Sequence, residues 1–254
     1  MRAGTYDQDV LLANSGTSAS PITARAEPGE RAEVRCWFET AGDHIVLEGF
    51  EIDGSYGSLL QSPYDDNGVN TRPALGVNVR SNFVTARNIE IHNRRYTLDR
   101  SRAGQGVFVQ GNNFTLKNSR LYHDGQIPAN NHEHNIYITT GDNFTIRDNI
   151  IYESADGGLQ MYPHAGNGLI EGNIFAYNGD PNKNCCGVAM LFGSSGQNVS
   201  ANNVMRVNVI AYTTSDYNVE AGSGQLNAGV SFPGAGSANW NEVVGNCCYH
   251  AELP

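Results

Sequence analysis

The chain has 254 residues and a formal net charge of −10, with 29 Gly but only 16 Lys and Arg together. This acidic balance argues against a nucleic acid or an anionic membrane as the partner, because both attract basic surfaces. No run approaches the ~18 apolar residues of a membrane span. The length allows one large all-β domain.

The N-terminal segment MRAGTYDQDVLL predicts a turn followed by a strand. It lacks the apolar core of a signal peptide. Because the segment begins within a strand-forming phrase, we expect a mature or trimmed form of a secreted or cell-surface protein.

Five cysteines stand singly or in adjacent pairs: Cys36, Cys185, Cys186, Cys247 and Cys248. Their spacing fits no zinc motif. Cross-links between the two pairs would suit an oxidising compartment, whereas free thiols would serve as small buried residues. Both interpretations stay open from the sequence.

From residue 31 onward, short phrases of alternating apolar and polar residues recur, and each ends in Gly, Asn or Asp. This alternation is the period of a β-strand followed by turn residues. Equivalent apolar residues recur at intervals of 30, 29, 23, 29 and 42 residues, namely Val77, Val107, Ile136, Leu159, Val188 and Val230. No segment keeps a 3.6-residue apolar period, so we expect no long helix.

Self-similarity with three short strands per repeat predicts an all-β, single-domain solenoid, a right-handed parallel β-helix of about seven to eight rungs. We expect irregular rungs in residues 1–43, regular rungs in 44–210, and a long connector with a C-terminal rung in 211–254. The open ends of such a solenoid favour self-association.

Stacked rungs should align similar side chains in columns inside the solenoid. The expected first column is Val79, Val109, Ile138, Met161, Met190 and Phe232. The second is Phe83, Phe114 and Phe144, and the third is Ile91, Leu121 and Ile151. At the bends we expect amide ladders from Asn88, Asn118, Asp148 and Asn203, because such side chains satisfy backbone groups between rungs.

The entry AGTYDQDVLLANSGTSASPITARAEPGE and the middle phrase EHNIYITTGDNFTIRDNIIYESADGGLQMY resemble the pectate-lyase-like superfamily of parallel β-helices. The resemblance covers nearly the whole chain and implies this fold. It also implies a protein that acts on polysaccharides. The motifs specify the scaffold more than the activity, since one scaffold hosts several chemistries.

The outward face of the first strand in each rung is polar and aromatic between residues 78 and 162. Aromatic rings beside amide and guanidinium groups suit a sugar chain. The candidates for substrate binding are Arg80, Phe108, Gln110, Gln160 and His164, with Tyr137 and Tyr162 as candidate catalytic residues.

The connector YHDGQIPANNHEHN places several titratable groups just before one of these strands. We expect His123, His132, His134 and His164 to gather at one edge of two adjacent rungs, with His134 as a catalytic base. Asp124, Glu133 and Asp156 provide oxygen ligands for a Ca²⁺ ion in the same region.

Lys117 and Arg147 occupy equivalent outward positions in successive rungs and should stand side by side. Like charges in that arrangement reduce stability, which suggests a function. The resemblance implies a catalytic Lys and Arg in related lyases. The alternative is a surface ion pair between Arg147 and Glu171.

These features favour a lyase that cleaves a uronate-containing polysaccharide by β-elimination. A non-catalytic glycan-binding or surface scaffold is the first alternative. A glycoside hydrolase with paired carboxylates among Asp124, Glu133 and Asp156 is the second.

Overall fold

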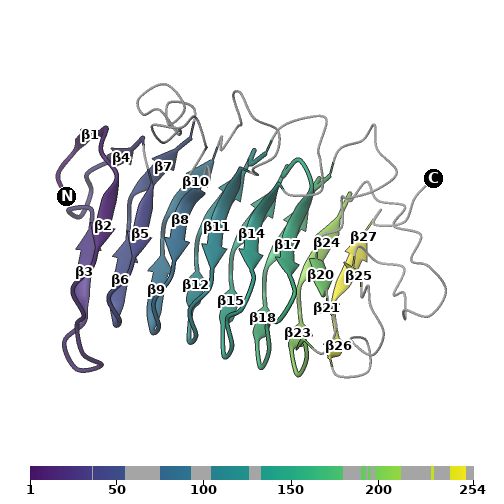
Figure 1. The fold of residues 1–254 in the computed structure, drawn as a ribbon. Coiled ribbons are helices and arrows are strands. Elements are labelled where there is room, and N and C mark those ends of the chain that lie inside the picture. The colour runs from purple at the N-terminus through teal and green to yellow at the C-terminus, as the bar shows by residue number, and fades with distance from the viewer. Residues whose placement is uncertain are drawn as a thin grey trace, which may run out of the picture.

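The computed structural model describes residues 1–35, 37–54, 75–92, 104–125, 133–179, 190–192, 194–195, 198–212, 230–231 and 241–249. Nearly all strands in this part of the chain belong to three parallel sheets, here named sheets A, B and C. The chain passes through the three sheets in turn and advances along one axis from the purple to the yellow end (Figure 1).

Sheet A contains β1 (Gly4–Tyr6), β4 (Ala32–Val34), β7 (Glu51–Asp53), β10 (Glu90–His92), β13 (Arg120–Tyr122), β16 (Ile150–Tyr152), β19 (Ile174–Ala176), β24 (Val209–Ala211) and β27 (Cys247–Tyr249). Sheet B contains β2 (Val10–Leu12), β5 (Phe38–Thr40), β8 (Leu75–Val79), β11 (Gln105–Val109), β14 (His134–Ile138), β17 (Gly157–Met161), β20 (Met190–Phe192) and β25 (Val230–Ser231). Sheet C contains β3 (Ile22–Arg25), β6 (Ile45–Glu48), β9 (Val84–Arg87), β12 (Thr115–Lys117), β15 (Thr145–Arg147), β18 (Leu169–Glu171), β23 (Val204–Arg206) and β26 (Glu242–Val244). A separate antiparallel pair joins β21 (Ser194–Ser195) to β22 (Asn198–Val199).

The expected all-β solenoid with three short strands per rung is confirmed. Along β9, β12 and β15, buried and accessible residues alternate, as they do in the sequence. The third predicted column is correct, since Ile91 pairs with Leu121 and Leu121 with Ile151, and all three are fully buried. These columns fill the interior as one continuous apolar core.

The predicted column of phenylalanines is wrong at its first member. Thr85 pairs with Thr115, so the residues that precede them, Val84 and Phe114, occupy equivalent positions. Both side chains are fully buried inside the solenoid. Phe83 is 48% exposed at a bend, with φ of 57°, and it stacks on His44. The sequence misleads because this rung has one more residue between its phenylalanine and the next bend than the following rung has.

A buried amide ladder exists, but it lies one residue beyond most of the predicted positions. Asn88, Asn118 and Asp148 adopt positive φ and turn the chain after sheet C. The ladder runs through the next residue of each rung, namely Ser119, Asn149, Asn173, Asn208 and Asn246. The prediction for Asn203 is confirmed at a second bend, the one before sheet C. The Asn203 amide donates to the Ala165 carbonyl at 3.0 Å and to Asn241 Oδ1 at 2.9 Å. Its Oδ1 accepts the backbone N–H of Gly168 at 2.8 Å.

Asn173 illustrates how the ladder works. Its amide donates to the Ile146 carbonyl at 2.8 Å and to the Asn208 side chain at 3.0 Å. Its Oδ1 accepts the backbone N–H of Asn149 at 3.0 Å and the side-chain amide of Asn149 at 2.9 Å. The bend therefore satisfies backbone groups that strand pairing leaves without partners.

The register of the rung at residues 190–192 differs from the prediction by two residues. Met190 pairs with Leu159, and Phe192 pairs with Met161. Met190 therefore continues the column of Val77, and the predicted equivalent Val188 lies outside the described residues. A shift of two residues keeps the same face inward, so alternation alone cannot reveal it.

Cys247 is a free, exposed thiol, and Cys36, Cys185 and Cys186 lie outside the described part of the chain. None of the described residues forms a helix long and apolar enough to span a bilayer.

Candidate functional site

The candidate site is the outward surface of sheet B, which we call the sheet B face. Strand pairing sets its central row, which is Glu39, Asn78, Phe108, Tyr137 and Gln160. The next row follows at the strand ends, with Arg80, Gln110, Thr139 and Tyr162. The predicted alternation of outward side chains is correct across these rungs.

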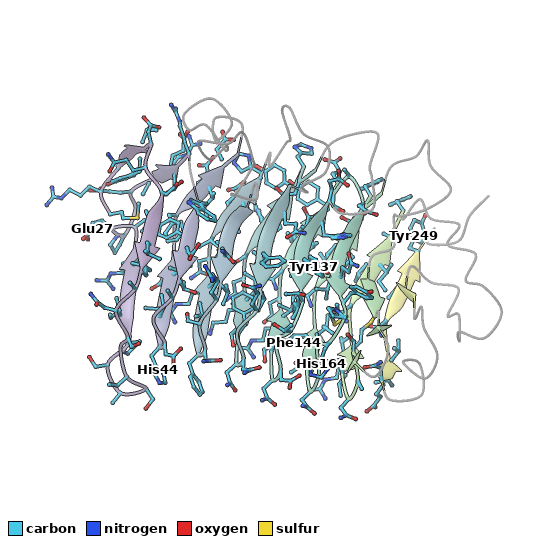
Figure 2. All side chains as sticks on the ribbon, in the orientation of Figure 1. Glu27, His44, Tyr137, Phe144, His164 and Tyr249 are labelled. Atoms are coloured by element: carbon cyan, nitrogen blue, oxygen red, sulfur yellow. The ribbon has the colours of Figure 1, made fainter. Side chains whose placement is uncertain are left out.

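Tyr137 lies at the centre of this face. Its ring meets Phe108 edge-on at 5.4 Å between centroids, and it meets His134 in the same manner at 5.7 Å. Burial raises the pKa of Tyr137 above its ordinary value, partly offset by a hydrogen bond with Thr139, and Tyr162 adds to the increase. Tyr137 therefore keeps its proton at neutral pH, as a proton donor must. Figure 2 labels Tyr137 midway along the stack.

Arg80 lies on the same face, two rungs before Tyr137. Its guanidinium is 3.2 Å from Glu39 Oε1, and Asn78 Nδ2 donates to Glu39 Oε2 at 3.1 Å. An exposed pair of this kind adds little stability, so a substrate carboxylate can replace Glu39 at small cost. Glu39 and Thr139 were not among the predicted site residues. Glu39 is 39 residues before its neighbour Asn78, a separation that hides their contact in the sequence.

His134 is buried behind Tyr137 at the start of β14. The backbone N–H of Gly157 donates to His134 Nδ1 at 3.2 Å, and Nε2 lies 3.9 Å from Asp156 Oδ2. In the neutral ring the proton is therefore on Nε2. The lone pair of Nδ1 accepts the Gly157 N–H and is not available to take a proton from a substrate. This geometry disfavours His134 as the catalytic base, and it suits a residue that orients the Tyr137 ring.

The three carboxylates predicted to bind Ca²⁺ are interior residues. Asp124, Glu133 and Asp156 are exposed by 0%, 3% and 1%. Asp124 reaches below Gly106, where any Cβ would overlap its carboxylate. Among the described side chains, no group of three or more His, Cys, Asp or Glu is arranged to hold a metal ion. As they are arranged, these residues do not fit a Ca²⁺ site. A requirement of the protein for calcium stays a prediction.

Burial of the same carboxylates argues against the glycoside hydrolase alternative. A hydrolase needs two carboxyl groups on opposite sides of the scissile bond. Asp124 and Asp156 lie beneath the sheet surface rather than facing it. The carboxylate on the described face is Glu39, which is paired with Arg80.

The expected cluster of four histidines does not form. His164 follows β17 and lies 3.5 Å from Asp142, beyond the far end of β14 from His134. Figure 2 labels His164 in the lower part of the view. His123 is on the sheet A side, paired with Glu153 at 2.5 Å, and His132 lies outside the described residues.

Lys117 and Arg147 do stand side by side, as predicted, but on sheet C. They therefore share no surface with Tyr137 and do not complete its site. The alternative pair is also wrong, because Glu171 bonds to Arg206 at 2.9 Å, and Arg147 lies 3.8 Å from Asp148.

Comparison with known proteins adds to this geometry. No family model matches the sequence, and no curated protein matches it. A solved structure titled "Crystal structure of pectate lyase Pel9A" aligns with 91% of the chain at a TM-score of 0.57 and 17% identity. The fold is a pectate-lyase-like parallel β-helix. The chain spans 58% of the length of that pectate lyase.

A second solved structure is the PL6 family polysaccharide lyase Pedsa3628 from Pseudopedobacter saltans. It aligns with all of this chain and 88% of its own, at 12% identity and a TM-score of 0.37. The first likeness confirms the resemblance found in the sequence at the level of the fold. It leaves the reaction to be argued from the sheet B face of this pectate-lyase-like β-helix.

Proposed function

We propose that the protein is a polysaccharide lyase that cleaves an acidic, uronate-containing chain by β-elimination on the sheet B face. The observation that carries the proposal is the position of Tyr137, a protonated phenol between aromatic neighbours on a surface that also presents Arg80. The name of the similar structure, a pectate lyase, accords with such a substrate.

The proposed chemistry needs three functions on one surface. A cation must hold the uronate carboxylate, a base must take the adjacent proton, and an acid must protonate the leaving oxygen. Arg80 supplies the cation by exchanging Glu39 for the substrate. Tyr137 supplies the acid, because burial keeps its hydroxyl protonated.

We assign proton abstraction to Tyr162, which lies one rung beyond Tyr137 on the accessible part of the face. Phe108 and Gln160 border Tyr137 in the same row and would contact the sugar rings. A secreted or cell-surface location accords with this substrate and stays a prediction.

The test is a substrate screen with two readouts. Purified protein is incubated with pectate, alginate, glycosaminoglycans and neutral glycans, each with calcium and with a chelator. The lyase produces ultraviolet-absorbing unsaturated uronates together with new reducing ends on an acidic polymer. New reducing ends without absorbance would instead indicate a hydrolase. Bound polymer with neither signal would indicate a glycan-binding scaffold.

A further inference from the structure

One row of outward side chains on sheet C carries an excess of positive charge. The row runs across successive rungs through Arg25, Glu48, Arg87, Lys117, Arg147, Glu171 and Arg206. Five cations therefore accompany two carboxylates in a chain whose net charge is −10. At physiological salt, charges beyond ~8 Å are screened, so a ligand on this row experiences the local excess of cations.

The central part of the row departs from the pairing seen elsewhere. Arg80 and Arg206 each lie within 3.2 Å of a carboxylate in a neighbouring rung, and Arg87 is paired with Glu48 at 3.0 Å. The departure begins at the next two cations. Lys117 has cations on both sides, and no ion pair involving it occurs among the described residues. Arg147 lies 3.8 Å from Asp148, which is exposed and adjacent in sequence.

Three consecutive cations on neighbouring strands repel one another at close range. Strands in a sheet stand about 4.8 Å apart, and like charges directly opposite each other are destabilising. Their side chains are accessible, with Arg87 and Arg147 exposed by 38% and 47%. Thr85, Thr115 and Thr145 form a parallel row of hydroxyl groups on the same face. A regular row of cations beside hydroxyls matches a linear chain that carries regular anions and hydroxyls.

We propose that the Arg87–Lys117–Arg147 row is a second polysaccharide-binding site, which holds an extended acidic chain across the rungs of sheet C. It lies on a different sheet from Tyr137, so it binds polymer without taking part in bond cleavage. In the context of the proposed lyase, this row retains the polymer near the protein. The site itself requires only a polyanionic glycan and stands whether or not sheet B is catalytic.

The test measures binding to pectate, with dextran as the neutral control. All proteins carry Tyr137→Phe, so that the polymer is not cleaved during the measurement. Lys117→Gln/Arg147→Gln is the test variant, and Arg206→Gln is the matched control from the same row, because Arg206 is already paired with Glu171. Affinity electrophoresis in pectate gels at low and high salt gives the dissociation constants.

We expect the double variant to bind pectate about tenfold more weakly at low salt, and to show a smaller salt dependence, since two cations that face the polymer are removed. Arg206→Gln should stay within about twofold, and no variant should bind dextran. The melting temperature of the double variant should equal or exceed that of the parent, because a repulsion is relieved. Unchanged pectate binding in the folded double variant would overturn the proposal.

Two further outcomes separate this site from its alternatives. Tighter binding of duplex DNA than of pectate at equal salt would refute a polysaccharide as the partner of the row. If the Tyr137→Phe protein binds pectate through Lys117 and Arg147 but the wild-type protein releases unsaturated uronate from none of the acidic polymers in the screen, the proposed lyase function is removed and this site still stands.

Discussion

At the scale of single residues, the same residue type has opposite roles in adjacent rungs. Phe114 is buried in the core, whereas Phe83 lies in a left-handed bend against His44. Position within the rung decides the environment. The letter pattern SNFV resembles GNNF closely enough to suggest equivalence, and only strand pairing shows that Val84 takes the core position.

This difference predicts unequal effects of one substitution. Phe114→Ala should reduce the free energy of unfolding by about 3–5 kcal/mol, because it removes a buried ring and leaves a cavity. Phe83→Ala should reduce it by no more than about 1 kcal/mol, because its ring is already partly hydrated. Urea unfolding followed by circular dichroism measures both values. Equal destabilisation by the two substitutions would show that the assignment of the column is wrong.

At the scale of structural elements, the strands are short and their bends carry much of the specificity. From Asn118 onward, the chain turns after sheet C at a residue with positive φ, and the next residue presents a side chain that bonds a neighbouring rung. Asn173 is fully buried in the middle of this ladder, whereas Asn246 lies at its C-terminal end and is half-buried.

The ladder predicts a gradient of stability along the stack. Asn173→Ala should destabilise the protein by about 3 kcal/mol, because it leaves two buried backbone groups of the preceding rung, the Ile146 carbonyl and the Asn149 N–H, without partners. Asn246→Ala should cost about 1 kcal/mol, because water can reach the groups that it exposes. The two variants are compared by the midpoint of urea unfolding. A larger effect at Asn246 than at Asn173 would contradict a continuous buried ladder.

The strand period and the repeat could be predicted from the sequence, and with them the three sheets and most core columns. Two local features could not. A shift of two residues at Met190 preserves the inward face, and the bend at Phe83 contains a hydrophobic residue. Each depends on contacts between rungs, which the alternation of residues along one strand does not encode.

For the candidate site, the sequence correctly predicts which side chains point outward on sheet B. It does not predict which outward rows, taken from different strands of a rung, lie on the same face as Tyr137. Lys117 and His164 come close to Tyr137 in the linear order of the rungs, but Lys117 lies on sheet C, and His164 follows β17, beyond the C-terminal ends of the sheet B strands. The contact of Glu39 with Arg80 joins two rungs that a long connector separates.

At the scale of the whole molecule, the β-helix offers long flat faces with different chemistry. Sheet B presents aromatic and amide side chains, and sheet C presents the row of cations around Lys117. A stack of rungs keeps each row straight, so a linear polymer can lie along several rungs at once. Self-association through the solenoid ends stays a prediction.

The central claim is that bond cleavage occurs on the sheet B face through Tyr137. The most direct test compares Tyr137→Phe with Tyr152→Phe, which removes the same hydroxyl group from a half-buried tyrosine on sheet A. Initial rates of unsaturated-uronate release give kcat and KM on the substrate identified by the screen, and circular dichroism confirms that both variants are folded.

We expect Tyr137→Phe to decrease kcat by about 10²–10⁴-fold, because the leaving oxygen loses its proton donor, while KM changes by less than about threefold. Tyr152→Phe should retain the kcat of the wild-type protein. A folded Tyr137→Phe variant with the same kcat as the wild type would contradict the account and place the chemistry elsewhere on the β-helix.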